Sequence, residues 1–322
     1  MPDAAKLPSA IAPMLATPGP VPQGTGWAAE FKHDGMRACV TSAGSRWQAR
    51  SRTGQDITSA FPEVGLLPDL TGGRRVVLDG ELVVLDEAGA PDFRRLQRRM
   101  GVREPSPGLL QTTPAVLYVF DLLVLDEREM TTAPYAERRA ALEGLALHGT
   151  GIETPPSFAD AASEVYAVAR EHRLEGIVCK RLAAPYRPGQ RCKSWVKTVI
   201  PHEADVVVCG WLPGRGRLSG AIGALVVGAY DRAGDLHLVG RVGSGLSSAS
   251  RQQLQHQLAP LRRSSPPAGH AESIAMADAT WVDPQVVARI AYRSWTDGHQ
   301  LRHPVYRGVL EDRDASAAQL PD

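Results

Sequence analysis

A lysine beside an Asp-Gly turn is the feature of this sequence best suited to covalent chemistry. Lys32 ends a strand-like run that begins at Trp27, in which apolar and polar side chains alternate. A deprotonated lysine amine is a nucleophile, and a neighbouring carboxylate such as Glu30 can orient it. Gly35, three residues later, gives the backbone room to approach a phosphate. The segment therefore predicts covalent nucleotide chemistry at Lys32.

Further charged and aromatic residues recur at predicted strands downstream of Lys32. They comprise an arginine at a turn, a carboxylate in an apolar strand, an aromatic in a core strand, an acid and a lysine that flank one strand, and a basic strand around Trp195. In that order the residues are Arg52, Glu81, Phe120, Glu175, Lys180, Arg191, Lys193 and Lys197. Their types and order predict a polyphosphate-binding site with bound cations.

The segments that carry these residues resemble motifs I, Ia, III, IIIa, IV and V of the ATP-dependent DNA ligases. The match is closest to the short bacterial ligases associated with double-strand-break repair, and it extends from residue 12 to residue 312. The resemblance implies an enzyme that adenylates Lys32 with ATP. It further implies transfer of AMP to a 5′-phosphate and sealing by attack of a 3′-hydroxyl.

The resemblance also implies roles for the individual side chains. An attacking lysine must be neutral, whereas an ordinary lysine with a pKa near 10.4 is protonated at pH 7. Lys180, Lys197 and a bound Mg²⁺ are the candidate cations that favour the neutral amine of Lys32 by like-charge repulsion. The expected nucleotide-binding residues are Glu30, Arg37, Arg52, Glu81, Phe120, Lys180, Arg191, Lys193 and Lys197.

Among these residues, Phe120 would stack on adenine, while Arg37 and Arg52 would hold ribose and phosphate. Glu81 and Glu175 suit Mg²⁺ (or Mn²⁺), because this hard cation takes carboxylate oxygens. Glu81 is equally a candidate for holding the ribose, so its role is divided between sugar and metal.

Three positions depart from the family pattern. Residues 301–313 resemble motif VI, which orients the pyrophosphate leaving group. Leu310 stands where the family usually has an arginine, and Arg313 replaces the usual lysine. In motif V, Val199 occupies the place of a second lysine. We expect slower self-adenylation, or a compensating role for Arg307 and Arg313.

Two basic clusters are the candidate nucleic-acid contacts. Arg94, Arg95, Arg98 and Arg99 would form one positive face of a helix predicted over residues 93–100. Arg215 and Arg217 belong to a glycine-rich loop. Both clusters would bind backbone phosphates of nicked or broken duplex DNA without reading its sequence.

The length of the chain, 322 residues, suggests about two domains at roughly 150 residues each. We expect an α+β nucleotidyltransferase (adenylation) domain with antiparallel sheets over residues 1–200. An oligonucleotide-binding (OB-fold) β-barrel would follow over residues 201–313, and residues 314–322 would form a C-terminal tail. Strands are predicted at 27–32, 38–42, 47–51, 76–86, 116–125, 176–180, 204–212, 223–230, 236–242, 280–282 and 286–293, and helices at 93–100, 135–145, 161–172 and 248–261.

Composition narrows the class of protein. A formal charge of +1 means that any affinity for nucleic acid depends on how the charge is distributed. The four cysteines include no Cys-x-x-Cys pair, which favours reduced thiols, and the longest apolar run is too short to span a bilayer. These features predict a cytoplasmic, nucleoid-associated monomer without membrane contact, and the resemblance makes end-joining repair factors its candidate partners.

Two other hypotheses about the function are compatible with the sequence. One is an RNA ligase or a capping-type nucleotidyltransferase, because hydrogen bonds to the purine edge decide the choice of base. The other is a non-catalytic OB-fold DNA-binding protein with a degenerate nucleotide pocket, which Leu310 and Val199 support.

Overall fold

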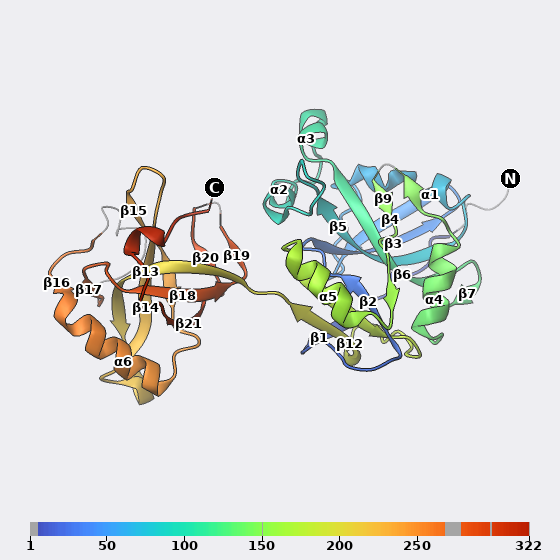
Figure 1. Cartoon of the computed structure of the whole chain (residues 1–322). Helices are drawn as coiled ribbons and strands as arrows, with labels where there is room; N and C mark the ends of the chain where they lie inside the picture. Colours follow the sequence, from blue (N-terminus) through green and yellow to red (C-terminus); the bar gives the residue numbers. More distant parts are fainter. Residues whose placement is uncertain (1–5, 150, 268–277, 297, 322) are drawn as a thin grey trace. The chain divides into compact units, whose positions relative to one another are not determined.

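The fold is described from a computed structural model of the whole chain. The structure describes residues 6–149, 151–267, 278–296 and 298–321. The chain divides into two compact units, residues 1–200 and 201–322, each with its own hydrophobic core (Figure 1).

The first unit contains two sheets, of which the first has five strands in the order β1-β12-β11-β2-β10. Its antiparallel strands are β2 (Trp27–Phe31), β10 (Phe158–Ala159), β11 (Gly176–Arg181) and β12 (Arg191–Val199). β1 (Leu15–Pro18) runs parallel to β12. β2, which ends just before Lys32, β11, which begins just after Glu175, and β12, which carries Lys197, are thus hydrogen-bonded neighbours.

The second sheet of this unit has seven strands built around four long antiparallel ones. These are β4 (Arg46–Ser51), β3 (Met36–Ala43), β5 (Val76–Val84) and β6 (Ala115–Leu125). The short strands β7 (Arg128–Glu129), β8 (His148–Gly149) and β9 (Ile152–Glu153) complete it, and β9 runs parallel to β6. β5 is apolar along most of its length because both faces of the sheet are covered.

Alternating side chains place three apolar layers in this unit. Trp27, Ala29, Ile177 and Cys179 face helix α5 (Ala162–Glu171) on the outside of the first sheet. The second sheet packs its outer face against η1 (Pro62–Leu66), α1 (Leu67–Leu70), α2 (Phe93–Gln97) and α4 (Tyr135–Glu143). A third cluster joins the two sheets and consists of Met14, Cys39, Val77, Leu123, Tyr186 and Trp195.

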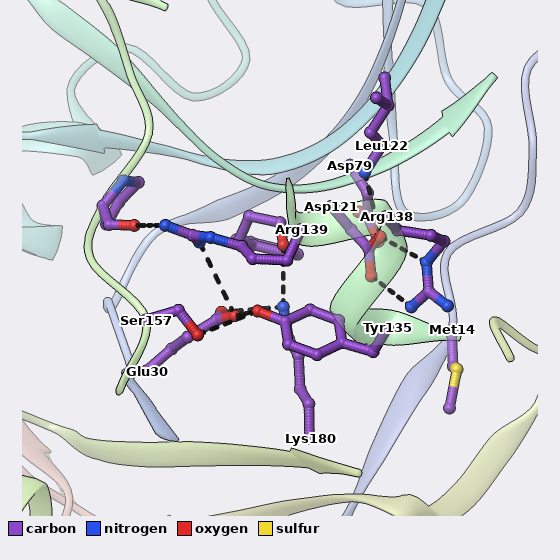
Figure 2. Close-up of polar contacts among 12 residues, drawn as sticks. Met14, Glu30, Asp79, Asp121, Leu122, Tyr135, Arg138, Arg139, Ser157 and Lys180 are labelled. Atoms are coloured by element: carbon purple, nitrogen blue, oxygen red, sulfur yellow. Dashed lines mark hydrogen bonds and ion pairs between the residues drawn. The ribbon is translucent and has the colours of Figure 1, made fainter. Parts of the chain in front are cut away.

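The start of α4 supplies a buried arginine to the second sheet. Arg138 donates Nε and Nη2 to the two carboxylate oxygens of Asp121 on β6, at 2.7 and 2.9 Å (Figure 2). Neither side chain is exposed to solvent. Arg138 also donates to the carbonyl oxygens of Ala133 and Ala184, so its charge is fully compensated in the interior.

The second unit is built on one long strand, β13 (His202–Pro213). It pairs with β14 (Ile222–Tyr230) on one side, and with β18 (Val287–Tyr292) and then β17 (Thr280–Val282) on the other. The remaining strands are β15 (Leu236–Val242), β16 (Arg262–Arg263), β19 (Ser294–Trp295), β20 (Leu301–Arg302) and β21 (Val305–Val309).

The strand path of this unit returns to its start. β14 pairs with β15, and β18 pairs with β21. A parallel bridge between Ser244 and Val305 then joins the segment after β15 to β21, where Tyr306 N donates to Ser244 O at 2.9 Å. A closed path of short antiparallel strands is typical of a small barrel. Helix α6 (Ser248–Leu258) packs Leu254 and Leu258 into the core, and short helical turns lie at η2 (Gly216–Leu218), η3 (Ala259–Leu261) and η5 (Ala315–Ala317).

Two sequence-based expectations about the fold need correction. The sheets of the first unit are mixed rather than wholly antiparallel, because β1 and β9 each pair in parallel. The expected C-terminal tail is also part of the second unit. Ala318 is fully buried, and Tyr230 exchanges backbone hydrogen bonds with Ala318 and Leu320 because the final residues cover one edge of the sheet.

The buried Arg138–Asp121 pair should contribute strongly to the stability of the first unit. We expect Asp121→Ala to lower the free energy of unfolding by about 3–5 kcal/mol, because it leaves a buried guanidinium without its partner. Arg74→Ala removes the partner of Asp126 from an exposed pair and should cost far less. Urea unfolding of the full chain measures both losses, and equal losses would contradict this assignment.

Candidate active site

Lys32 lies just beyond the end of β2 and contacts a carboxylate. Its Nζ is 2.5 Å from Oε2 of Glu175, the residue before β11. The two side chains retain 19% and 10% of their exposure, so solvent-borne molecules can still reach the amine. Lys32 N donates to Gly176 O at 2.9 Å, which fixes the backbone of the lysine to the strand of its partner. The pair is therefore accessible and held in a defined position.

Register across the first sheet places the motif residues in rows. Glu30, Val178 and Lys197 lie opposite one another across β2, β11 and β12. Two rows further along, Lys32 is hydrogen-bonded to Gly176, which is paired with Val199. Val199, the position at which the family usually has a lysine, therefore lies in the row of Lys32. The substitution removes a cation from the immediate surroundings of the nucleophile.

Gly176 and Gly35 are required by close packing on either side of Lys32. A Cβ on Gly176 would collide with the Thr198 carbonyl oxygen, and Gly176 has φ +146°. A Cβ on Gly35 would collide with the Leu82 carbonyl oxygen of β5. We predicted Gly35 from the approach of a phosphate, but its nearest neighbours are atoms of residues 81–83 in the chain itself.

A polar network surrounds Glu30 (Figure 2). The Tyr135 hydroxyl from α4 donates to Glu30 Oε1 and also lies 3.1 Å from Ser157 Oγ. Lys180 Nζ is 2.8 Å from the other oxygen, Oε2, and Arg139 is 4.0 Å from Oε1. Burial, and then the Glu30 charge, raise the pKa of Tyr135, so its hydroxyl stays protonated and donates. Glu30 is thereby fixed two residues before the nucleophile.

Lys180 occupies a different place from the one predicted. Its side chain is 1% exposed, and Nζ donates to Phe120 O at 3.0 Å as well as pairing with Glu30. The rings of Phe120, Tyr135 and Trp195 surround the ammonium group at 4.5–4.9 Å. Burial lowers the pKa of Lys180, and the neighbouring carboxylates oppose that effect. Lys180 therefore joins β11 to β6 and is not exposed to a bound phosphate.

Arg37 is likewise engaged inside the protein. Its Nε and Nη2 donate to the carboxylate of Asp79 at 2.5 and 2.6 Å, and Nη2 also donates to Met14 O. Tyr186 donates its hydroxyl to the same carboxylate at 2.5 Å. The predicted contact of Arg37 with ribose or phosphate is not what this geometry provides, because the guanidinium already links β3, β5 and the segment before β1.

Glu81 lies on β5 opposite Arg37. The charges of Lys32 and Glu175 are near enough to act on the pKa of Glu81. Burial raises the pKa of Glu81 to about 7, Glu175 adds to the shift, and Arg37 and Lys32 oppose it. Two carboxylates that repel one another are suited to a divalent cation. No group of three or more His, Cys, Asp or Glu residues that could hold a metal ion occurs in the described part of the chain.

The remaining predicted nucleotide ligands lie on β12, at the turn after β4 and on β6. Lys193 and Arg52 are exposed, and Lys197 is partly buried. Arg191 is exposed as well but donates to Ala16 O of β1. Phe120 packs on two cations, with Arg37 and Lys180 at 4.7 and 4.6 Å from its ring centroid. All four of the basic residues among them keep solvent-exposed surface and stay candidate phosphate contacts, namely Arg52, Arg191, Lys193 and Lys197.

The predicted arginine face on α2 is only partly correct. Arg94 and Arg98 are exposed, whereas Arg95 donates to Leu85 O and is a third exposed. Arg99 has no exposed surface, because its guanidinium binds Glu63 and two backbone carbonyls. Arg99 is therefore not available to DNA. In the second unit, Arg215 and Arg217 are both exposed as predicted.

The motif VI positions lie in the second unit. Leu310 packs with Val207, Cys209 and Val287, so the position usually occupied by arginine is part of an apolar cluster. Arg313 is 56% exposed and lies 4.0 Å from Asp205, which also accepts from Arg289 at 2.9 Å.

Several residues of the site were not found from the sequence. Tyr135, Asp79, Tyr186 and Arg138 form the hydrogen bonds that position Glu30, Arg37 and Asp121. His33 is another such residue. Its ring packs on Tyr118 with the centroids 4.6 Å apart, and burial lowers its pKa to about 4. The only sequence signal for these residues was their presence within or near the motifs, since partners 17 to 107 residues apart cannot be paired from spacing.

Comparison with known families agrees with this geometry. The model of the ATP dependent DNA ligase domain matches residues 13–198, and that of the ATP dependent DNA ligase C terminal region matches residues 218–313. The first match covers more than half of the chain. The two-unit fold, with Lys32 next to Glu175, is that of a covalent nucleotidyltransferase. The chain belongs to the ATP-dependent DNA ligase family.

Individual relatives place it within this family. The chain is 37% identical over 314 residues to the multifunctional non-homologous end joining DNA repair protein LigD of Mycobacterium tuberculosis, over 95% of this chain and 39% of that protein. The ligase domain of M. tuberculosis LigD has a TM-score of 0.56 and 35% identity, and mycobacterial DNA ligase D complexed with ATP and MES has 0.55 and 34%. Each of these two structural matches covers 97% of this chain and 98% of the compared chain. The chain thus spans about two fifths of the curated LigD proteins it matches.

The raised pKa of Glu81 makes a prediction about stability in the absence of divalent cations. Below the ordinary pKa of 4.5 the side chain is protonated in the folded and unfolded protein alike, so Glu81→Gln should change little. Between pH 4.5 and about 7 the unfolded protein releases this proton while the folded protein keeps it, so wild type loses stability over that interval, which the glutamine variant avoids. We expect the variant to gain up to about 3 kcal/mol over wild type by pH 8.

Urea unfolding at several pH values measures this difference. Glu104→Gln, at an exposed position of the same unit, is the matched control and should show no such dependence. A constant difference between Glu81→Gln and wild type from pH 4 to pH 8 would contradict the burial of this carboxyl group.

Proposed function

We propose that this chain is an ATP-dependent DNA ligase that seals 5′-phosphate/3′-hydroxyl breaks in duplex DNA during end-joining repair. The observation that carries the proposal is the Lys32–Glu175 pair. It is accessible to solvent, it lies at the ends of β2 and β11, and the chain that contains it belongs to this family. The end-joining role is supported by the description of its LigD relatives, and ATP by a similar structure that contains it.

The chemistry starts at the Lys32 amine. Nζ attacks the α-phosphorus of ATP, the new N–P bond forms, and the bond from the α-phosphorus to the pyrophosphate oxygen breaks. Glu175 orients Nζ and must release it, or accept its proton, before the attack. Lys193, Lys197 and Arg52 are placed to offset charge on the phosphates. AMP then passes to the DNA 5′-phosphate, and the 3′-hydroxyl displaces it.

A divalent cation would be held by Glu175 and Glu81. When bound, Mg²⁺ or Mn²⁺ neutralises phosphate charge and favours the neutral form of a nearby amine. Glu81 would bind this cation in its ionised form, and its raised pKa would then fall because the cation stabilises the carboxylate. The alternative role of Glu81, holding the ribose, uses the same carboxylate.

The second unit and the arginine clusters would supply DNA binding. The closed strand path of residues 201–309 is suited to an OB-fold role, and Arg215 and Arg217 extend from it next to η2. Arg94 and Arg98 of the first unit, with Arg95 beside them, would bind backbone phosphates. We place the protein at the nucleoid of the cytoplasm as a monomer. In the described part of the chain no helix has the length and apolarity to cross a membrane.

An RNA ligase or capping-type activity is the second candidate within the same chemistry. The Glu30–Tyr135–Lys180 network fixes a carboxylate near the nucleotide but does not choose between polymers. A non-catalytic DNA-binding protein is disfavoured by the intact Lys32–Glu175 pair. Its support is limited to Leu310 and Val199, which lie in an apolar cluster and in the row of Lys32.

Self-adenylation tests the proposal directly. Incubation with ATP labelled at the α-phosphate and Mg²⁺ should give a labelled protein band. Lys32→Ala should abolish this band, because the variant lacks the amine that would attack the α-phosphorus. Lys6→Ala, which removes an exposed lysine of the same unit, is the matched control and should retain it.

The polymer is then tested with nicked substrates. Wild type should seal nicked duplex DNA and leave nicked RNA unsealed, whereas the reverse preference would establish the RNA ligase alternative. A purified chain that never becomes labelled but still binds DNA would overturn the catalytic proposal in favour of the binding protein.

A further inference from the structure

Residues 98–113 form an excursion between α2 and β6 that we call the arm. It contains α3 (Pro107–Thr112), which projects from the first unit beside α2 (Figure 1). No residue of α3 is buried, so this helix is not held by an apolar face. Only two arm residues are fully covered by the protein, Arg99 and Thr113, and they lie at its two ends.

Arg99 fastens the two ends of the arm to one point. Its Nη1 donates to Thr113 O at 2.7 Å, and Nη2 donates to Ala60 O at 2.7 Å. The same guanidinium forms two hydrogen bonds with the carboxylate of Glu63 on η1. Glu63 in turn accepts from Ala115 N at 3.0 Å, at the start of β6. This Arg99–Glu63 anchor holds the root of the arm, while its outer part stays exposed.

The outer surface of the arm is basic. Arg98 and Arg103 are exposed, and within the described residues no carboxylate lies at ion-pair distance from either. Arg94 lies one helical turn before Arg98 and is exposed as well. The arm contains one carboxylate, Glu104. Between the arginines, Met100 keeps 42% of its surface exposed.

We propose that the arm is a positioned grip for duplex DNA. This inference rests on the proposed DNA ligase function and deepens it by adding Arg103, Met100 and the Arg99–Glu63 anchor to the contact surface. Unpaired arginines on a surface bind phosphates at little desolvation cost, and an exposed methionine between them suits the sugar edges of a groove. The Arg99–Glu63 anchor acts as a positioning pair, because a fixed root removes the entropy that a mobile loop would lose on binding.

Binding of the full chain to nicked duplex DNA at several salt concentrations tests the surface. Arg98→Ala combined with Arg103→Ala should weaken binding about tenfold or more near 0.1 M salt, and should reduce the slope of log affinity against log salt by about two. Arg46→Ala combined with Arg170→Ala removes the same charge from exposed positions outside the arm. This control should bind within about twofold of wild type.

The results separate this inference from the function on which it rests. If the arm variant binds DNA as wild type does and still becomes adenylated, the DNA grip is wrong, and the arm would fit an acidic protein surface instead. If wild type never becomes adenylated, the ligase proposal fails, while the DNA-binding comparison still decides the role of the arm.

The anchor is tested by Arg99→Met combined with Glu63→Gln, which removes both charges and keeps an acceptor for Ala115. We expect faster deuterium uptake over residues 100–112, DNA binding weakened about as much as in the surface variant, and self-adenylation retained. Faster uptake with unchanged DNA affinity would overturn the positioning role. Loss of folding would be visible as faster uptake throughout the first unit, and the surface variant then carries the test.

Discussion

The buried pair of Glu30 and Lys180 is the interaction on which the active site depends. It joins β2 to β11, and through Phe120 O it also ties both strands to the second sheet. A lysine surrounded by three aromatic rings would be costly if it were unpaired, so Glu30 is needed to keep the ammonium group there. Because Lys32 follows Glu30 by two residues, the same pair fixes where the nucleophile leaves the sheet.

A second buried pair repeats this design deeper in the unit. Arg37 and Asp79 join β3 to β5, and Tyr186 adds a hydroxyl to the same carboxylate. Asp121 and Arg138 do the same between β6 and α4. In each case a motif residue that could have faced a ligand is instead satisfied by the protein. None of these three pairs uses the groups proposed for catalysis, which are Lys32, Glu175, Glu81 and the basic residues of β12.

The order of the main elements could be predicted from the sequence for physical reasons, and the assignment of Lys32 as the nucleophile stays a prediction. β2, β5 and β6 alternate or run apolar over five to eleven residues, and such runs are readable without a structure. The short parallel partners β1 and β9 were missed because two to four residues show no period. The roles of Lys180, Arg37 and Arg99 could not be predicted, since burial depends on partners such as Glu63 that are distant in the chain. A helix with four arginines looks uniformly basic in sequence, but one of them points inward.

The packing of Gly35 against β5 has a mechanical consequence. A Cβ on Gly35 would collide with the Leu82 carbonyl oxygen of β5, and the next residue, Met36, pairs with Leu82 in the β3–β5 ladder. The turn after Lys32 and the strand that carries Glu81 are therefore joined by backbone pairing and by close packing at the same point. Any side chain at position 35 would push this turn away from β5 and so shift Lys32 relative to Glu81.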